Sequence, residues 1–436
     1  MIPTQRLLLL TLLGVVPVVA AASNDQLWLA VLLYVVMLGV LVAVDWRITP
    51  KPATLEIARI NEPKLSLGAP NKITLALHNE SPRTLDLTIR DEFPLDFPAD
   101  ALYLKVRLGP DEVGEVAYHV RPTKRGDYRF GNINVRYLSV LRLFQRQMAV
   151  PFDEVVKVYP NVLDVRKYDM LARKGMLFEL GLRTARVFGS GTEFERLREY
   201  TPDDEFRAIN WKATARRNKL IAAEYETERS QYVVTVLDTG RFMRPVIGDI
   251  AKLDYAINAS LMLAYVAMLK GDHIGMLSFA DHVGRYLQPR RGKGQFYQML
   301  EMLYNLPSQP VESDYGRALS YLGLKNKRRS LVVVFTDLST MDAARPLINH
   351  LTRLAKTHLP VCVVMSDPNV TTYTGMDVAA SHEIYERAVA EMVMDERRVV
   401  LDTLNQAGVY TIDVPANKLT VSVINKYLEL KGRGLI

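Results

Sequence analysis

The chain has 436 residues, of which 49% are hydrophobic and 24% are charged, and its formal net charge is +7. These ordinary globular values exclude a disordered or collagen-like chain, and the length suits two to three domains. The mild basic excess does not by itself indicate nucleic-acid binding. Cys362 is the single cysteine, so an intramolecular disulfide and a multi-cysteine zinc or iron–sulfur site are excluded.

Residues 1–50 are predicted to form a transmembrane helical hairpin. Residues 7–22 are apolar apart from Thr11, and residues 27–44 form a second run of 18 residues without a charge. The second run is long enough to cross a hydrocarbon core, whereas the first is marginal. A cleavable signal peptide is the alternative for the first run, because it ends in three alanines.

Charges around the two apolar runs predict the orientation of the hairpin. Arg6 precedes the first run, Asp25 lies between the runs, and Arg47, Lys51 and Arg59 follow the second. Positive flanking charge stays on the inner side of bacterial membranes, so both ends of the hairpin are expected in the cytoplasm. We therefore expect a multi-pass protein of the bacterial inner membrane whose main soluble domains lie in the cytoplasm.

Residues 51–160 are predicted to form an antiparallel β-sandwich. Apolar and polar residues alternate over several short segments, separated by Gly, Pro, Asn and Asp: 54–60, 73–77, 85–89, 115–120 and 132–137. Short alternating strands at this spacing are typical of a sandwich. His78 and His119 stand alone in such strands, and we interpret both as ordinary strand residues without a chemical role.

Residues 231–436 are predicted to form a Rossmann-like α/β domain. Continuous apolar runs at 232–238, 331–337 and 360–367 each end in Asp. Further strands are expected at 273–279, 283–287 and 409–414, and helices at 250–270, 294–304, 315–324, 343–358 and 377–406, followed by a last helix. Continuous apolar strands separated by helices favour a central parallel sheet covered on both faces.

Polar residues at the ends of these strands are the candidate site. Ligands of open α/β sheets bind beyond the carboxyl ends of the strands. Asp238, Ser313 and Asp337 are candidates to share one divalent ion such as Mg²⁺, which prefers hydroxyl and carboxylate oxygens; Asp367 ends a third strand. The alternative is structural: Ser313 or Asp314 caps a helix, and the strand-end aspartates begin turns.

Common catalytic signatures are missing from the sequence. It contains no Walker phosphate loop, no His-Glu-x-x-His motif and no Gly-x-Ser-x-Gly nucleophile elbow. Cys362 lies inside a predicted buried strand, so we interpret it as a core residue rather than a nucleophile.

Residues 161–230 are predicted to be a charged connector with little periodicity. Acidic and basic residues alternate densely in it, with Tyr200, Ile209 and Trp211 as apolar anchors. The favoured interpretation is a solvated, salt-bridged segment that packs on the α/β domain. The alternative is a protein-docking surface in which Arg207 and Arg216 pair with carboxylates.

The connector resembles the signature of the bacterial domain-of-unknown-function family 58. The matching residues are Glu193-Phe194, Arg198-Glu199-Tyr200, Asp204, Arg207, Ile209, Trp211-Lys212 and Thr214-Ala215-Arg216. Asp203 stands where the family usually has Gly. The N-terminal membrane hairpin, the β module and a C-terminal von Willebrand factor A-like domain are similar too, so the resemblance covers essentially the whole chain.

The resemblance implies a metal-ion-dependent adhesion site with Asp-x-Ser-x-Ser after the first strand. This chain has Asp238-Thr239-Gly240-Arg241-Phe242, so both serine hydroxyls are replaced. Ser313 stands for the family's threonine, with Asp314 beside it, and Asp337 matches the later aspartate. Since magnesium demands near-complete octahedral coordination, we expect a degenerate site that is empty or binds Mg²⁺ weakly.

The resemblance further implies an adaptor that works with a MoxR-type AAA+ ATPase. We expect a membrane-anchored cytoplasmic scaffold that binds protein through Asp204, Arg207, Trp211, Arg216 and Asp314, and that is not an enzyme and does not bind nucleic acid. A metal-dependent hydrolase using the strand-end aspartates is the alternative. A third possibility is a purely structural organiser of a membrane complex.

Overall fold

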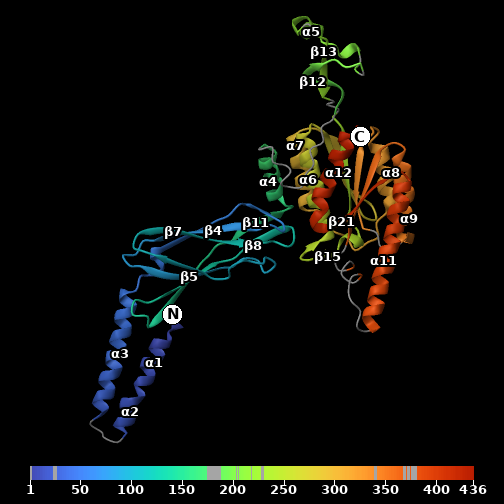
Figure 1. Cartoon of the computed structure of the whole chain (residues 1–436). Coiled ribbons are helices and arrows are strands. Elements are labelled where there is room, and N and C mark those ends of the chain that lie inside the picture. Colours follow the sequence, from blue (N-terminus) through green and yellow to red (C-terminus); the bar gives the residue numbers. More distant parts are fainter. Residues whose placement is uncertain are drawn as a thin grey trace. The chain divides into compact units, whose positions relative to one another are not determined.

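The computed structural model describes residues 2–22, 27–173, 188–202, 204, 206–217, 219–226, 230–337, 341–366, 370, 374 and 381–436 (Figure 1). The chain divides into two compact units, Met1–Tyr159 and Pro160–Ile436. The first unit contains the apolar N-terminal helices and a β-sandwich, and the second contains an α/β domain.

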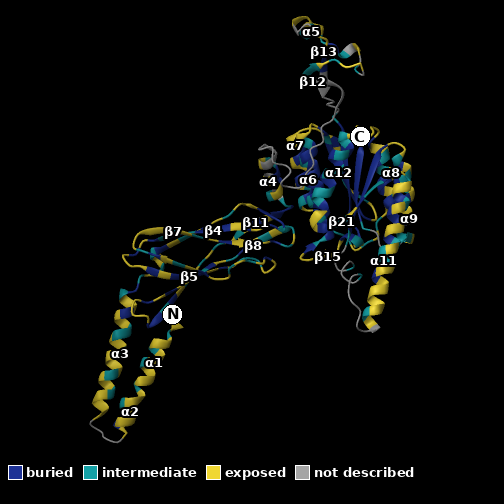
Figure 2. Ribbon diagram, in the orientation of Figure 1, coloured by how far each residue is buried: buried dark blue, intermediate teal, exposed yellow. Residues whose placement is uncertain are grey.

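The N-terminal helices expose apolar side chains along most of their length (Figure 2). They are α1 (Gln5–Leu13), α2 (Val15–Ala21) and α3 (Trp28–Ile48), and a two-residue strand, β1 (Ile2–Pro3), precedes them. In the described part of the chain, only the helix that starts at Trp28 is long and apolar enough to cross a membrane, and Gln5–Ala21 is shorter. The expectation of two membrane-spanning helices is therefore reduced to one candidate span.

The sandwich is built from three sheets with the strand orders β1-β10-β9-β5-β6, β2-β4-β7 and β3-β11-β8. Their strands are β2 Leu55–Ile60, β3 Lys64–Ser66, β4 Asn71–Asn79, β5 Leu85–Asp91, β6 Leu104–Leu108, β7 Glu112–Val120, β8 Gly126–Phe130, β9 Ile133–Leu138, β10 Phe144–Val150 and β11 Glu154–Tyr159. Neighbouring strands are antiparallel except β3 and β11, which are parallel. Alternate residues of β4, such as Ile73, Leu75 and Leu77, are buried in the core, as the period-two pattern predicts.

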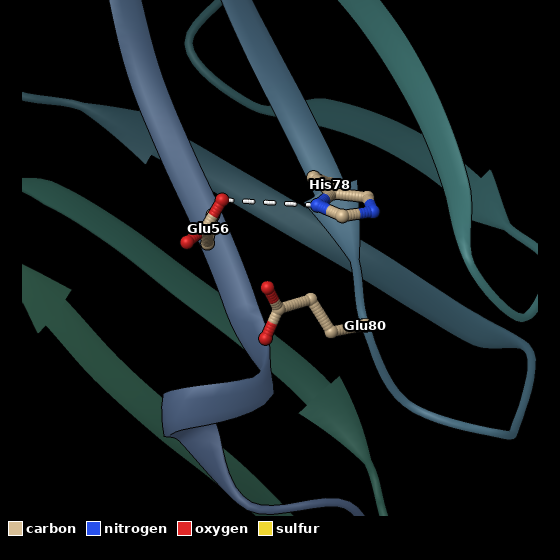
Figure 3. A group of neighbouring side chains, drawn as sticks. All are labelled: Glu56, His78 and Glu80. Atoms are coloured by element: carbon tan, nitrogen blue, oxygen red, sulfur yellow. Dashed lines mark ion pairs between the residues drawn. The ribbon is translucent and has the colours of Figure 1, made fainter.

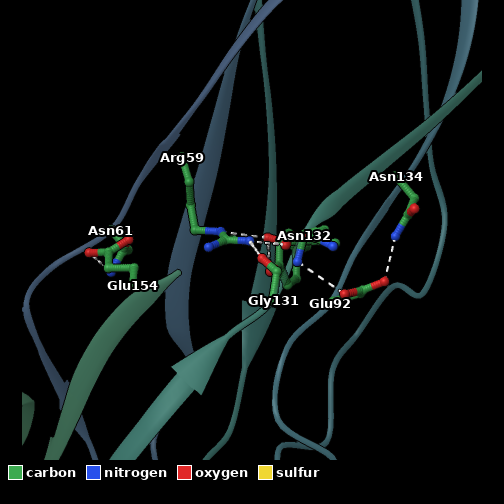
Figure 4. Close-up of polar contacts among 9 residues, drawn as sticks. Arg59, Asn61, Glu92, Gly131, Asn132, Asn134 and Glu154 are labelled. Atoms are coloured by element: carbon green, nitrogen blue, oxygen red, sulfur yellow. Dashed lines mark hydrogen bonds and ion pairs between the residues drawn. The ribbon is translucent and has the colours of Figure 1, made fainter. Parts of the chain in front are cut away.

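A buried ion pair crosses the interior of the sandwich. Arg59 of β2 pairs with Asp91 of β5 and donates a 2.9 Å hydrogen bond to the carbonyl of Gly131 (Figure 4). The Tyr118 hydroxyl donates to the same carboxylate at 2.6 Å. Arg59 is therefore an interior residue, and it does not act as the juxtamembrane surface charge that the sequence analysis assigned to it.

Both ends of the helical segment are fastened to the β9–β10 turn. β1 pairs with β10, and the Thr4 hydroxyl donates to the carbonyl of Leu143 at 2.9 Å. At the end of α3, the buried Asp45 carboxylate accepts hydrogen bonds from the Ser139 hydroxyl at 2.5 Å and the Leu141 amide at 2.7 Å. Helices and sandwich therefore form one unit, held at two points.

The second unit has a six-stranded sheet in the order β18-β17-β14-β19-β20-β21. The strands are β14 Tyr232–Asp238, β17 His273–Phe279, β18 Val283–Arg290, β19 Leu331–Phe335, β20 Leu359–Ser366 and β21 Tyr410–Pro415. All neighbours are parallel except β18, which is antiparallel to β17. β14 comes first along the chain; β17 and β18 follow it on one side of the sheet, and β19, β20 and β21 follow on the other, so the strand order reverses at β14 as in doubly wound folds. The predicted parallel sheet is confirmed, except that its edge strand β18 is antiparallel.

Helices cover both faces of this sheet (Figure 1). One layer is α6 (Lys252–Leu269), α7 (Lys293–Tyr304) and α12 (Leu419–Gly432), and the other is α8 (Tyr315–Lys325), α9 (Met341–Ala355) and α11 (Ser381–Gln406). Every residue of β19 is buried, which explains why its sequence is continuously apolar. The helix predicted to start at residue 250 starts at Lys252 instead, because β16 (Ile250–Ala251) pairs with β15 (Val246–Ile247).

The connector has regular structure that its sequence did not indicate. After α4 (Val162–Arg173), the strands β12 (Phe188–Glu199) and β13 (Ile221–Glu226) form an antiparallel hairpin. Between them lie a short 3-10 helix, η4 (Phe206–Ala208), and α5 (Trp211–Arg217). Asp203 lies outside the described residues.

Candidate functional site

Asp238 and Asp337 follow neighbouring parallel strands at the carboxyl-terminal edge of the sheet. Asp238 is the last residue of β14, and Asp337 comes two residues after β19 ends at Phe335. β14 is the strand at which the order of the sheet reverses, which is where ligands of doubly wound folds bind. Asp367, the third strand-end aspartate, lies outside the described residues.

The carboxylate of Asp238 accepts four hydrogen bonds from inside the fold. Oδ1 accepts from the Gly240 amide at 2.8 Å and the Ser313 hydroxyl at 2.5 Å. Oδ2 accepts from the hydroxyls of Thr336 at 2.7 Å and Tyr315 at 3.2 Å. A carboxylate has about four lone-pair positions, so these donors use all of them and leave none for a metal ion.

Burial raises the pKa of Asp238 above its usual range, although its hydrogen bonds act in the opposite direction. The side chain is fully inaccessible to solvent. Burial also raises the pKa of the Tyr315 phenol, which therefore stays a hydrogen-bond donor at neutral pH. The Asp238 carboxylate at the end of β14 is thus buried and held by a cluster of hydrogen bonds.

Gly240 stands at the position that the resemblance assigns to the first adhesion-site serine, and a Cβ atom there would meet close neighbours. A Cβ atom built on Gly240 would lie 2.1 Å from the Ser313 hydroxyl oxygen and 3.0 Å from the carbonyl of Val311. Thr239 directs its hydroxyl to the carbonyl of Phe279 at 2.8 Å, so it holds two strand ends together. Neither residue presents a ligand atom to a shared ion.

Asp337 pairs with cationic side chains that the sequence analysis missed. The Lys252 ammonium group, from the first turn of α6, lies 2.6 Å from Asp337 Oδ2. Arg397 of α11 approaches Oδ1 at 3.6 Å and also pairs with Asp413 of β21 at 2.6 Å. The side chains of Lys252, Asp337 and Arg397 are all about one-tenth exposed or less, so these ion pairs are largely desolvated.

These contacts do not fit a divalent metal site. Magnesium needs near-octahedral oxygen coordination, whereas Asp238 has its oxygens occupied and Asp337 is already neutralised by Lys252. Ser313 contacts Asp238 directly instead of facing it across an ion. The Lys252 ammonium supplies the positive charge that an ion would otherwise bring to Asp337.

A pocket of about 190 Å³ nevertheless opens between these residues. Ser313, Tyr315 and Asp337 line it, and Phe242 and Pro346 form apolar walls. Glu312 and Asp342 add carboxylates whose side chains are 67% and 87% exposed. Ser313 and Asp337 thus share one pocket, which is acidic at its rim.

Asp314 caps a helix. Its side chain accepts the backbone N–H of Arg317 at 2.8 Å, in the first turn of α8. It also lines a shallow neighbouring pocket of about 440 Å³, together with Asp281, Glu312 and His350. This capping bond matches the structural alternative for Asp314, and the pocket extends the acidic surface around the strand ends.

Two candidate residues of the connector differ in exposure: the side chain of Asp204 is largely covered, whereas Trp211 is exposed. Asp204 pairs with Arg198 at 2.5 Å, and the hydrogen bonds of that guanidinium lower the pKa of Asp204 to about 2. Trp211 is 57% exposed and stacks edge-on against Phe206 with ring centroids 5.7 Å apart. Trp211 therefore does not act as a buried anchor.

The two basic candidates of the connector lie on the short helices between β12 and β13. Arg216 is exposed on α5, and Arg207 lies on η4.

Cys362 is fully buried in β20, and burial raises its pKa to about 12, which confirms a core role.

Comparison with known proteins gives one family match. Residues 196–373 match the family described as "Protein of unknown function DUF58". This confirms, over those residues, the family resemblance found in the connector.

Two curated relatives are uncharacterized proteins. "Uncharacterized protein YeaD" of Bacillus subtilis is 24% identical over 234 residues, which are 52% of this chain and 54% of that protein. "Uncharacterized protein Rv1480" of Mycobacterium tuberculosis is 24% identical over 183 residues, which are 41% of this chain and 56% of that protein. The chain spans about half the length of the curated relatives it matches.

Two solved structures show distant similarity. The similarity to the SpRpn10 VWA domain covers 45% of this chain and 95% of that domain's chain, with 13% sequence identity and a TM-score of 0.31. The similarity to the conserved hypothetical protein BatB from Bacteroides thetaiotaomicron covers 47% of this chain and 100% of that protein's chain, with 14% sequence identity and a TM-score of 0.34.

Proposed function

We propose that this chain is a membrane-anchored adaptor that binds a partner protein at the carboxyl-terminal edge of its α/β sheet, without a bridging metal ion. The observation that carries the proposal is the Lys252–Asp337 ion pair beside the saturated carboxylate of Asp238. An adhesion site of the usual kind uses an ion to attract an acidic residue of its partner. Here an internal cation, the Lys252 ammonium, neutralises Asp337 instead.

The pocket at this edge favours a basic residue of the partner. Among the described residues, its exposed carboxylates, Glu312 and Asp342, form ion pairs with the surface residues Arg241 and Arg345, each at 3.3 Å. Exposed pairs of this kind contribute little to stability, so a partner cation can replace either arginine at small cost. Phe242 and Pro346 offer the apolar contact that the stem of an inserted Lys or Arg needs.

The apolar N-terminal helices are proposed to cross the bacterial inner membrane as a hairpin. Support comes from the exposed apolar faces of α1, α2 and α3, and from the attachment of both ends to the same sandwich turn. The hydroxyl of Tyr34 on α3 also donates to the carbonyl of Leu10 on α1, which joins the two arms. With Arg6, Arg47 and Lys51 flanking the helices, the soluble units lie in the cytoplasm.

A MoxR-type AAA+ ATPase is the proposed partner. The test is binding of the full-length protein in nanodiscs to such an ATPase, measured by biolayer interferometry. Glu312→Lys and Asp342→Lys each reverse an exposed pocket charge, and Asp402→Lys reverses an exposed charge on the distal half of α11 as a matched control. We expect each pocket variant to weaken binding roughly tenfold, or about 1.4 kcal/mol, and the control to leave it unchanged.

The same binding measurement in the presence of a chelator tests whether binding needs a metal ion. Excess EDTA should leave binding unchanged, since Lys252 supplies the charge at Asp337. With no nucleotide present in either measurement, loss of binding in EDTA would contradict the metal-free mechanism, and equal weakening by Asp402→Lys would contradict the location of the site. Absence of ATPase binding by the unmodified protein would remove this partner.

The hydrolase alternative has little structural support. Water activation by a metal needs open ligand positions, and the four donors around Asp238 leave none on that carboxylate.

A further inference from the structure

One side-chain cluster of the sandwich lies outside the proposed docking site and contains the ligand types of a transition-metal site. Glu56, His78 and Glu80 bring one ligand atom each to within 4.8 Å of one another (Figure 3). From the sequence, His78 stands alone and is interpreted as an ordinary strand residue, and Glu56 lies far from it along the chain. Strand pairing brings the two together.

The backbone places all three side chains on one face of the sheet. Glu56 of β2 and His78 of β4 are directly paired residues of antiparallel strands, so their side chains lie side by side. Glu80 is two residues beyond His78, and its amide still donates to the carbonyl of Thr54 at 2.9 Å, which continues the pairing. Residues two apart in a strand point to the same face.

The imidazole of His78 has a separate carboxylate at each ring nitrogen. Nδ1 faces Glu56 at 3.7 Å, and Nε2 lies 3.2 Å from the carboxylate of Asp111, which precedes β7. Metal-ligating histidines use one nitrogen for the ion and donate the other N–H to a carboxylate that orients the ring. Asp111 occupies that orienting position, so Nδ1 is directed toward Glu56.

The local charge is unbalanced in the absence of a cation. Three carboxylates, from Glu56, Glu80 and Asp111, surround one imidazole, and among the described residues none of the three pairs with a Lys or Arg. Even a protonated His78 would neutralise only one of them. A divalent cation would relieve the remaining repulsion between like charges.

We propose that Glu56, His78 and Glu80 bind a zinc ion, with His78 Nδ1 and two carboxylate oxygens as ligands and Asp111 orienting the ring. Bond lengths of about 2.1 Å place tetrahedral zinc ligands roughly 3.4 Å apart. The two glutamates are exposed and His78 is partly exposed, so we expect side-chain rotation to close the present spacing. The fourth position faces solvent and takes water.

Calorimetric titration of the tag-free, full-length protein in detergent with zinc chloride tests the proposal. The unmodified protein should bind one zinc ion saturably at this site. His78→Ala should abolish that binding, Glu56→Gln and Glu80→Gln should weaken it, and Asp111→Asn should weaken it by about 10- to 100-fold. X-ray absorption of the zinc-loaded protein should show a nitrogen and oxygen shell with one imidazole.

His119→Ala is the matched control. His119 is an exposed strand histidine that pairs with one carboxylate, Asp100 at 2.9 Å, and belongs to no such three-ligand cluster among the described residues. Zinc binding should survive this substitution. Circular dichroism verifies that each variant is folded. Absence of saturable zinc binding in the unmodified protein, or equal binding by the His78→Ala and His119→Ala variants, would overturn the proposal.

Discussion

At the residue scale, the environment of Asp238 determines how its charge affects the fold. Burial raises its pKa, whereas four hydrogen-bond donors partly offset that effect. Because the folded-state pKa lies above the ordinary value of 3.8, the stabilising contribution of the neutral form is complete below that value. It is lost as the pH rises through the raised folded-state pKa.

Asp238→Asn should remove this pH dependence. The free energy of unfolding of the unmodified protein, minus that of the variant, should increase as the pH is lowered from neutral toward 4, since only the unmodified protein gains a proton on folding at this site. Urea titrations followed by far-ultraviolet circular dichroism at several pH values measure the difference. A difference that stays constant or falls with decreasing pH would contradict a raised pKa.

Gly240→Ser restores an adhesion-site serine in sequence but should not restore the site. The new Cβ would overlap the Ser313 hydroxyl, so the variant should lose about 1–3 kcal/mol of stability and gain no magnesium binding. Thermal unfolding with and without magnesium measures both effects. Gly323→Ser is the control, because a Cβ there meets nothing within 4 Å. Stabilisation of the Gly240→Ser variant by magnesium would show that the site can still coordinate an ion.

The sequence alone placed Asp238 and Asp337 at neighbouring strand ends, because a continuous apolar run ending in Asp is a local pattern. It did not reveal Lys252 or Arg397. Each of these belongs to a helix and reaches Asp337 only through tertiary packing, so no spacing in the sequence connects them. The sequence therefore could not predict the ion pairs that argue against a metal ion at Asp337. The replacement of the two adhesion-site serines did predict weak metal binding.

At the element scale, the C-terminal end of α3 is hydrogen-bonded directly to the sandwich through the side chain of Asp45. Its carboxylate accepts from the Ser139 hydroxyl and from the amides of Leu141 and Leu143, and the Thr49 hydroxyl oxygen accepts from the Val140 amide at 3.2 Å. From the sequence, the apolar run of this helix is predicted to end at Val44. Nothing local in the sequence showed that the next residue was an anchor, because its partners are about 95 residues away.

Asp45→Ala should weaken this junction. The substitution leaves buried donors of the β9–β10 turn without an acceptor, and each unsatisfied group costs about 1–3 kcal/mol. We expect a lower unfolding temperature and faster protease cleavage within residues 139–143 in detergent. Arg47→Ala, an exposed residue of the same helix end, should change neither. Equal cleavage rates in both variants would show that the carboxylate does not hold the turn.

The β12–β13 hairpin was missed because its sequence lacks the usual strand pattern. Charged residues such as Glu193, Arg196 and Arg198 interrupt it, and bulges shift the register of pairing between residues 188 and 196. Ile209 is buried while Trp211 is exposed, although both looked like apolar anchors. Which of two nearby apolar residues is covered depends on the fold of the hairpin, and composition does not determine it.

At the scale of the whole molecule, the proposed topology can be tested by cysteine labelling. Cys362 is fully buried and should not react, so single new cysteines report alone. In intact cells, a membrane-impermeant maleimide should label Leu27→Cys at the start of the second helical arm. It should label Asp96→Cys in the sandwich and Asp402→Cys in the α/β domain only after lysis. Labelling of either soluble position in intact cells would reverse the orientation.

The paired attachment of β1 and Asp45 to one turn also has a mechanical consequence. A membrane segment joined at one point can swivel, whereas one joined at two points transmits rotation and tilt. In a hairpin that crosses the bilayer as proposed, any force that changes the angle of α3 would therefore turn the sandwich with it, and lateral strain in the membrane would act directly on the β9–β10 turn.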